Sequence, residues 1–578
     1  MSKNFDRLFK LGFAFNLIGM MSLLIDFGFS HSVNSHIWIS LVYFVALLFG
    51  VANTIIRYFL RKKSFRPKVL FFDALSFLLA VWAIYYFFTC PNFDDYHSFG
   101  LVKLSLTISF IREFSERKLV LKRKVLNPAQ FFILSFLTII FLGMLGLMLP
   151  NSSHDGIGII DALFTSTSAV CVTGLIVVDT ATYFTPFGQG LILILIQIGG
   201  IGILTFATYF SYFFKGEVTY ENQITMGDMT STGKLGEVFS TLKNILIITF
   251  LIETISAISI FSTLNSGSFQ SLYDRVFFSV FHAVSAFCNA GFSTLSNGLY
   301  EEGFQFNYGL QLIIIFTLVL GGLGFPIVVN LVNFFKYSLI RTFTFNQKRK
   351  KYQPWVLNIN SRITLITTLV LIVFGFVVFF LLEYNTTLKP HNNFGKIVTA
   401  LFEATTPRTA GFNTIDMLQL SFPAILVTII LMWIGASPAS TGGGIKTSTI
   451  AVAVLNIFSL AKGKNRIEVY RREISNLSVG RAFAVITLSL FTIGCGIVII
   501  SISDKDLDVL KITFECFSAY STVGLSLGLT SQLSATAKVV IIFLMFIGRV
   551  SVLSVLAAIF RREKYKNYRY PSEEVTIN

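Results

Sequence analysis

Four short segments of this sequence place a glycine six residues after a hydroxyl side chain, a pattern suited to binding a cation through backbone carbonyl oxygens. The glycines are Gly174, Gly291, Gly411 and Gly524, separated by 117, 120 and 113 residues. The hydroxyl belongs to a serine in three segments and to Thr405 in the other. Glycine adopts backbone angles closed to other residues, so such a loop can turn its carbonyl oxygens toward an ion. The repeat predicts four similar loops around one pathway.

We expect each loop to supply its glycine and the two preceding residues to a selectivity filter for a cation. The predicted filter residues are Val172, Thr173, Gly174, Asn289, Ala290, Gly291, Thr409, Ala410, Gly411, Thr522, Val523 and Gly524. Helix–helix packing in a membrane is the alternative for any one of these glycines. Helix packing does not account for four glycines that recur with matching segments on either side.

Each glycine lies at the same place in a repeated order of apolar segments. A segment of 12 to 15 residues precedes it, too short to cross a bilayer and suited to a re-entrant helix; these segments are 159–170, 273–287, 394–405 and 507–519. A full-length span comes before each of them, at 130–149, 244–264, 363–382 and 482–502. A further apolar span, containing a second glycine, follows each loop. The predicted unit is therefore outer helix, short helix, glycine loop and inner helix.

The composition of this chain is too apolar for a protein surrounded by water. Of its 578 residues 54% are hydrophobic and 13% are charged, and the mean hydropathy is +0.71, whereas soluble domains carry about 25% charged residues. We predict an all-α integral membrane fold that crosses the cytoplasmic (inner) membrane many times, in contact with lipid.

The net charge of +16 does not indicate nucleic-acid binding, because the basic residues gather between apolar spans. They cluster at 57–68, 112–124, 336–351, 462–472 and 561–569. Such clusters are typical of cytoplasmic loops, so we expect both termini to be cytoplasmic.

The spans divide the chain into an N-terminal region, four units and a tail. The predicted boundaries are 1–125 for extra transmembrane helices, 126–214, 215–335, 336–461 and 462–562 for pore units one to four, and 563–578 for a cytoplasmic tail. The N-terminal region has three clear spans, at 8–29, 37–60 and 69–89, and a shorter fourth at 99–114. The fourth carries Lys103 and Arg112 without the three-residue arginine spacing of a voltage sensor, and its role is open.

Other chemistries lack the residues they need. The five cysteines, Cys90, Cys171, Cys288, Cys495 and Cys516, have no CxxC spacing and predict free thiols rather than a zinc site or a disulfide framework. No cluster of acids, histidines or a nucleophile–base pair stands out within the spans. A membrane-embedded enzyme is therefore a remote alternative, and no covalently bound cofactor is expected.

The third inner span is interrupted. Between Trp433 and Thr447 it contains a proline, four glycines and several small hydroxyl residues, so no continuous helix is expected there. The order Gly-Ile-Lys-Thr and the lack of a preceding strand argue against a phosphate-binding loop. The fourth inner span carries Arg549 where the other units have Gly200, Gly322 and Ala436.

From about residue 126 to 562 the chain resembles the superfamily of potassium transporters that includes TrkH, KtrB and the plant HKT proteins. The resemblance is carried by 168–175, 287–294, 406–413, 436–450 and 521–526. It implies four channel-like units in one subunit, a homodimer, and a cytoplasmic nucleotide-binding ring of the TrkA/KtrA kind as a partner. A nucleotide is expected to act only through that partner ring. In that family serine in the first loop is associated with sodium preference, so Gly174 at this position implies K+ rather than Na+ as the ion held by the filter residues. A sodium-permeable or sodium/proton-coupled symporter of the same superfamily stays open as an alternative.

The resemblance also implies an intramembrane gating loop at the interrupted span. The predicted gate residues are Gly435, Ser437, Pro438, Gly442, Gly443, Gly444, Lys446 and Arg549. We expect Arg549 to lie below the filter, to bond carbonyls of this loop and to repel cations in the closed state, because a charge at that depth should face water or a polar partner. Snorkelling at a helix end is the alternative.

Other polar residues near the loops are expected to be structural. Arg408 should turn away from the pathway, to pair with an acidic residue or to cap backbone carbonyls. His282 should be a hydrogen-bonded packing residue. Several acidic residues fall on predicted outer loops and could raise the local cation concentration; they are Asp155, Asp161, Asp179, Glu301, Glu302, Asp504, Asp506 and Asp508.

Overall fold

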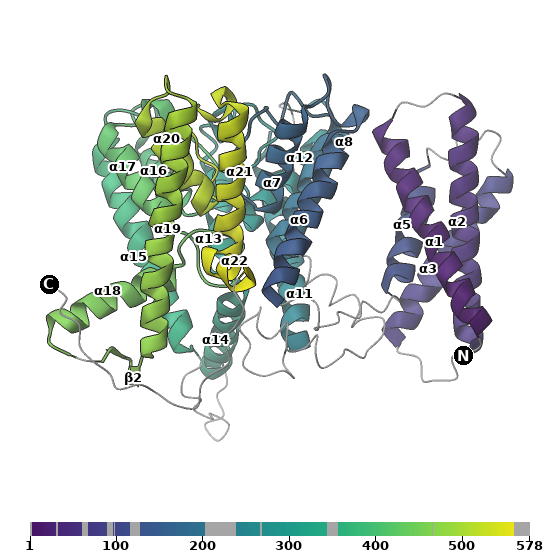
Figure 1. The fold of residues 1–578 in the computed structure, drawn as a ribbon, viewed down its shortest axis with the longest axis horizontal. Helices are drawn as coiled ribbons and strands as arrows, with labels where there is room; N and C mark the ends of the chain where they lie inside the picture. The colour runs from purple at the N-terminus through teal and green to yellow at the C-terminus, as the bar shows by residue number, and fades with distance from the viewer. Residues whose placement is uncertain are drawn as a thin grey trace.

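The computed structural model describes residues 3–29, 33–60, 67–89, 96, 99–115, 128–202, 238–265, 267, 269–343, 357–464 and 466–559. Regular structure in these ranges is helical apart from one short antiparallel pair, β1 (Glu468–Val469) and β2 (Arg472–Glu473). The predicted all-α fold is confirmed (Figure 1). The predicted basic segments fall partly outside these ranges, at 61–66, 116–124, 344–351 and 561–569, as do Cys90 and the tail at 563–578.

Six of the described helices are long and apolar enough to cross a membrane, and a bent pair makes a seventh. Three belong to the N-terminal region: α1 (Lys3–Gly28), α2 (Val33–Leu60) and α3 (Pro67–Thr89). The other three are the outer helices α11 (Val238–Thr263), α15 (Ile359–Leu382) and α19 (Asn476–Ser503). Their apolar side chains are widely exposed, as expected for surfaces that face lipid.

The N-terminal helices form a bundle of their own. Helix α5 (Gly100–Ser115) covers the predicted fourth segment and completes the bundle with α1, α2 and α3. Figure 1 shows this bundle, in purple, standing beside the four units. The two parts touch where the Asn151 amide donates to the Phe27 carbonyl at 3.2 Å and the Phe27 ring stacks on Phe187.

Each of the four units contains the predicted series of helices. The first outer helix is α6 (Pro128–Leu147), and the short helices before the glycine loops are α7 (Ile159–Val170), α12 (Leu272–Cys288), α16 (Asn393–Thr405) and α20 (Val509–Ser521). The inner helices are α8 (Pro186–Ile201), α13 (Tyr308–Gly322), α17 (Phe422–Trp433) and α21 (Ala535–Val550). Polar caps start several of them: the Asn392 side chain accepts from Gly395 N–H, and Ser534 from Ala537 N–H.

The four units close into a ring. Each short helix packs against the inner helix of the preceding unit in the ring: α12 against α8, α16 against α13, α20 against α17 and α7 against α21. The contact between α7 and α21 joins the first unit to the last. The carboxyl ends of all four short helices lead directly into the glycine loops, and this end of a helix carries a partial negative charge.

The inner helices differ from the sequence prediction, which expected an interruption only in the third. Helix α8 ends just before Gly202 (φ +85°), α21 ends just before Ser551 (φ +76°), and α13 is followed after Gly324 (φ +81°) by α14 (Phe325–Phe343) at 108°. A left-handed residue stops the helical hydrogen-bond pattern. Helix α22 (Val552–Ile559) follows α21, and α18 (Thr447–Ala461) follows α17 after the longest break.

Candidate ion pathway

The four loop glycines form a closed ring. A Cβ atom built on Gly174 would lie 2.4 Å from the Ala290 carbonyl oxygen, and one on Gly291 would lie 2.9 Å from that of Ala410. A Cβ atom built on Gly411 would lie 2.2 Å from the Val523 carbonyl oxygen, and one on Gly524 would lie 2.3 Å from that of Thr173. Each loop therefore sets the carbonyl before its own glycine against the glycine of the neighbouring loop. Any larger residue would displace that carbonyl.

The backbone of the four loops alternates in handedness. The residue two places before each glycine has a positive φ, 58° at Val172, 59° at Asn289, 68° at Thr409 and 51° at Thr522. The glycines themselves have φ between 70° and 93°. Alternation between the two hands turns successive carbonyl groups to the same side of the chain. Such a run of carbonyls is how a backbone replaces the hydration shell of a cation.

Hydroxyl side chains on the short helices hold the loops in this conformation. Ser168 accepts from the Gly174 N–H and Ser518 from the Gly524 N–H, each at 3.1 Å, and Ser285 donates to the Phe292 carbonyl at 2.8 Å. In the third unit the corresponding bond comes from Thr406, which donates to the Phe412 carbonyl at 2.5 Å.

The predicted hydroxyl of the third unit is therefore displaced by one residue. Thr405 bonds instead to carbonyls within its own helix, those of Leu401 and Phe402. The extra turn that follows α16 shifts the register.

Two buried carboxylates that the sequence prediction missed support the segments after the glycines. Glu403 on α16 accepts from the Thr414 hydroxyl at 2.9 Å, and Glu515 on α20 accepts from the Thr530 hydroxyl. Their side chains are 2% and 0% exposed. The sequence signal that could have identified them is an acidic residue within a short apolar helix, since a buried carboxylate needs hydrogen-bond partners. His282 plays the comparable part in α12, with ring nitrogens 2.9 Å from the Phe278 carbonyl and from Ser293 Oγ, as predicted.

A cavity of about 390 Å³ opens on the side of the ring where the loops leave the glycines. All four glycines line it, together with Asp179 and Asp416. Other predicted outer acids have structural partners: Asp161 pairs with Lys538 at 2.7 Å, and Asp504 accepts from Ser534 N–H at 3.0 Å.

The broken third inner helix forms a loop at residues 434–446, which we call the central loop. It lies against the opposite side of the ring: Gly443 N–H donates to the Thr522 hydroxyl at 2.9 Å, and a Cβ on Gly442 would meet the Thr409 hydroxyl at 2.1 Å. The loop also binds the break in α13, where Ser437 N–H donates to the Gly322 carbonyl at 3.0 Å. The freed backbone groups of two broken helices thus satisfy one another, as is required at membrane depth.

Two cations hold the central loop. Lys446 donates to the Gly442 carbonyl at 2.7 Å, which folds the loop back on itself. Arg549 on α21 donates to the Thr441 carbonyl and, at 2.6 Å, to the Gly199 carbonyl on α8. The guanidinium group therefore spans the space below the ring, between the central loop and the first inner helix, and does not snorkel outward.

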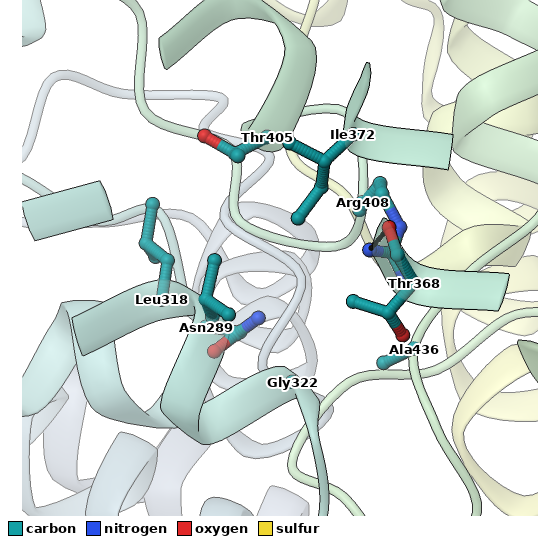
Figure 2. Close-up of a pocket in the computed structure, with 9 residues that line it drawn as sticks. Asn289, Leu318, Gly322, Thr368, Ile372, Thr405, Arg408 and Ala436 are labelled. Atoms are coloured by element: carbon teal, nitrogen blue, oxygen red, sulfur yellow. Dashed lines mark hydrogen bonds between the residues drawn. The ribbon is translucent and has the colours of Figure 1, made fainter. Parts of the chain in front are cut away.

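Arg408 lies beside a small cavity that Figure 2 shows, and none of the four loop glycines lines this cavity. Its guanidinium group donates to the Thr368 carbonyl at 3.4 Å, which agrees with the predicted capping of a backbone carbonyl. The alternative of an acidic partner is not found among the residues that the structure describes.

Comparison with known proteins agrees with this architecture. Residues 103–568 match the family described as TrkH: Cation transport protein. The potassium/sodium uptake protein NtpJ of Enterococcus hirae is 33% identical over 463 residues, which are 79% of this chain and 98% of that protein. The Ktr system potassium uptake protein B of Bacillus subtilis is 35% identical over 464 residues, with the same shares.

A solved structure shares the fold. The crystal structure of the potassium transporter TrkH from Vibrio parahaemolyticus superposes with a TM-score of 0.60 and 17% identity, covering 90% of this chain and 96% of that one. The fold and the pathway define a multi-pass membrane transport protein built from four glycine-loop units. The chain belongs to the TrkH family of cation transport proteins.

Proposed function

We propose that this protein takes up potassium by conducting K+ across the cytoplasmic membrane through the ring of four glycine loops. The closed contacts between each glycine and the carbonyl of the next loop carry the proposal, because they gather backbone oxygens from all four units at one level. The relatives named for potassium uptake support K+ as the cargo.

The same geometry supports our assignment of a filter and a gate. The filter comprises the predicted residues 172–174, 289–291, 409–411 and 522–524, and the central loop is the gate. In the described arrangement the central loop touches Thr409 and Thr522, and Arg549 adds a positive charge beneath it. This arrangement corresponds to a closed state, since a cation leaving the filter would meet both the loop and the guanidinium group.

Regulation is proposed to come from the cytoplasmic side. A nucleotide-binding ring would move α14 or α18, which leave the breaks in α13 and α17, and so draw the central loop aside. The word "system" in the Bacillus subtilis relative's name fits a second component of this kind. A homodimer and cytoplasmic termini complete the proposal, and co-purification with a candidate ring protein, with and without ATP, tests the partnership.

Rubidium uptake into liposomes that contain the purified protein tests the cargo. Uptake should fall when external K+ is added and should fall much less with Na+. Absence of uptake, both with and without the ring partner, would contradict the proposed function. Equal competition by Na+ would contradict only the selectivity, and the potassium/sodium name of the Enterococcus hirae relative makes this sodium-permeable or ion-coupled alternative the second candidate.

A further inference from the structure

Among the residues that the structure describes, Arg408 is a buried cation without a counter-charge. Its side chain is 9% exposed, and no described residue accepts a hydrogen bond from its Nε–H. The two other buried arginines of the described chain pair with carboxylates, Arg57 with Glu113 at 2.6 Å and Arg112 with Asp73. A charge removed from water needs a partner of opposite sign to offset its lost hydration. The single long bond to the Thr368 carbonyl does not supply one.

The cavity beside Arg408 has room for one small occupant. Its volume is about 20 Å³, above the roughly 10–15 Å³ that a single water molecule requires. Figure 2 shows Arg408 and Thr368 on one side of the cavity and Asn289 and Leu318 on the other. Residue Ala436 of the central loop closes the lower edge. The occupant would therefore touch the second and third units and the central loop at once.

The polar groups around the cavity favour an anion. The Arg408 Nε–H is a charged donor, and the Thr368 hydroxyl is a second buried group with no hydrogen-bond partner in the described part of the chain. None of the residues that line the cavity is acidic. A water molecule would satisfy hydrogen bonds and leave the positive charge in place, whereas an anion would satisfy both needs. The volume is too small for sulfate or phosphate.

We propose that this cavity is a halide site, which chloride occupies as the missing counter-ion of Arg408. The site lies one residue before Thr409, so the bound anion offsets a positive charge next to the glycine ring. Resting on the proposed function, this makes K+ binding by the third loop dependent on halide. Exchange of chloride for a large organic anion would then weaken rubidium uptake several-fold at low rubidium concentration.

Halide binding is measured directly on the full-length protein, independently of transport. Crystals grown in bromide should show an anomalous peak within hydrogen-bond distance of Arg408 Nε. The melting temperature at fixed K+ should be a few degrees higher in chloride or bromide than in gluconate. A cavity that holds water and gives no bromide peak, with equal melting in all three anions, would overturn the proposal.

Two variants assign the effect to the cavity. Arg408→Gln removes the charge. Thr368→Val removes the second donor and keeps Arg408, so it tests the site even if Arg408→Gln does not fold. Both should lose the difference between chloride and gluconate. Thr367→Val is the matched control, because that hydroxyl bonds to the Ile363 carbonyl within α15 and does not line the cavity; it should keep the difference. If no variant or wild-type protein carries rubidium, the proposed function fails and the bromide result still decides the site.

Discussion

Arg549 donates a hydrogen bond to the Gly199 carbonyl at 2.6 Å, which ties the last inner helix of the chain to the first. These residues are 350 positions apart in the sequence, and the bond closes the ring below the glycines just as the packing of α7 on α21 closes it above. The same guanidinium group holds the Thr441 carbonyl of the central loop. Arg549 is thus a single connection among three of the four units.

Replacing Arg549 by glutamine should open the pathway. The loss of both the positive charge and the bond to Thr441 frees the central loop, so rubidium uptake without any partner should rise several-fold. Lys538→Gln on the same helix is the matched control, since Lys538 pairs with Asp161 far from the central loop. Unchanged uptake and unchanged regulation in Arg549→Gln would mean that Arg549 has no part in gating.

Replacing Gly174 by serine should weaken the preference for K+ over Na+. The new Cβ would lie 2.4 Å from the Ala290 carbonyl, which must then move out of the ring. A loss of about 1.4 kcal/mol in the relative binding free energy corresponds to a tenfold fall in selectivity, measured as Na+ competition with rubidium uptake. Gly494→Ala, where a Cβ has open space on α19, should leave selectivity unchanged.

Replacing Asp73 by asparagine should destabilise the N-terminal bundle. It leaves Arg112 of α5, 1% exposed, without the carboxylate to which it is paired, and breaking a buried pair in this way costs about 3–5 kcal/mol. Thermal unfolding or limited proteolysis of the purified protein measures the change. Lys464→Ala breaks an exposed pair with Glu468 and should cost under about 1 kcal/mol. Equal effects of the two substitutions would contradict the structural role of the Arg112 pair.

Acid should weaken the carboxyl end of α15 through Glu383. Burial opposes ionisation, but hydrogen bonds from Ser421, Thr386 and Thr387 prevail and lower the pKa of the Glu383 carboxyl. A lowered folded pKa contributes stability above the ordinary glutamate pKa of about 4.3, and this stability is lost as the pH falls through the lower folded value. Melting temperatures measured from pH 6 downward should drop less steeply in Glu383→Gln than in the parent protein. Parallel curves would contradict this origin.

The four-fold repeat could be predicted from the sequence because it depends on local properties of each loop and of the segment before it. A positive φ favours glycine at each loop, and the segment before it is too short for a helix that crosses the membrane. Helix α7 begins and ends at the predicted residues, and α16 begins one residue earlier than predicted.

The remaining features depend on contacts between distant segments. The break at Gly324 lies against the central loop, where Phe325 N–H donates to the Ala439 carbonyl, and the break at Ser551 occurs at a residue whose type does not favour a positive φ. The pairing of Arg112 with Asp73, and the lack of a carboxylate beside Arg408 among the described residues, likewise arise only when the helices are assembled. Residue types indicate that a buried charge needs a partner, but not which residue supplies it.

The glycine ring is assembled from four loops of a single chain, and the residues before its glycines are Thr173, Ala290, Ala410 and Val523. In a channel made of four identical subunits, one altered codon changes all four quadrants of the filter together. Here a codon change alters one loop of the ring and leaves the other three intact, so substitutions can change ion preference one loop at a time. Evolution and the experimenter alike can therefore explore intermediate filters that a symmetric channel never forms.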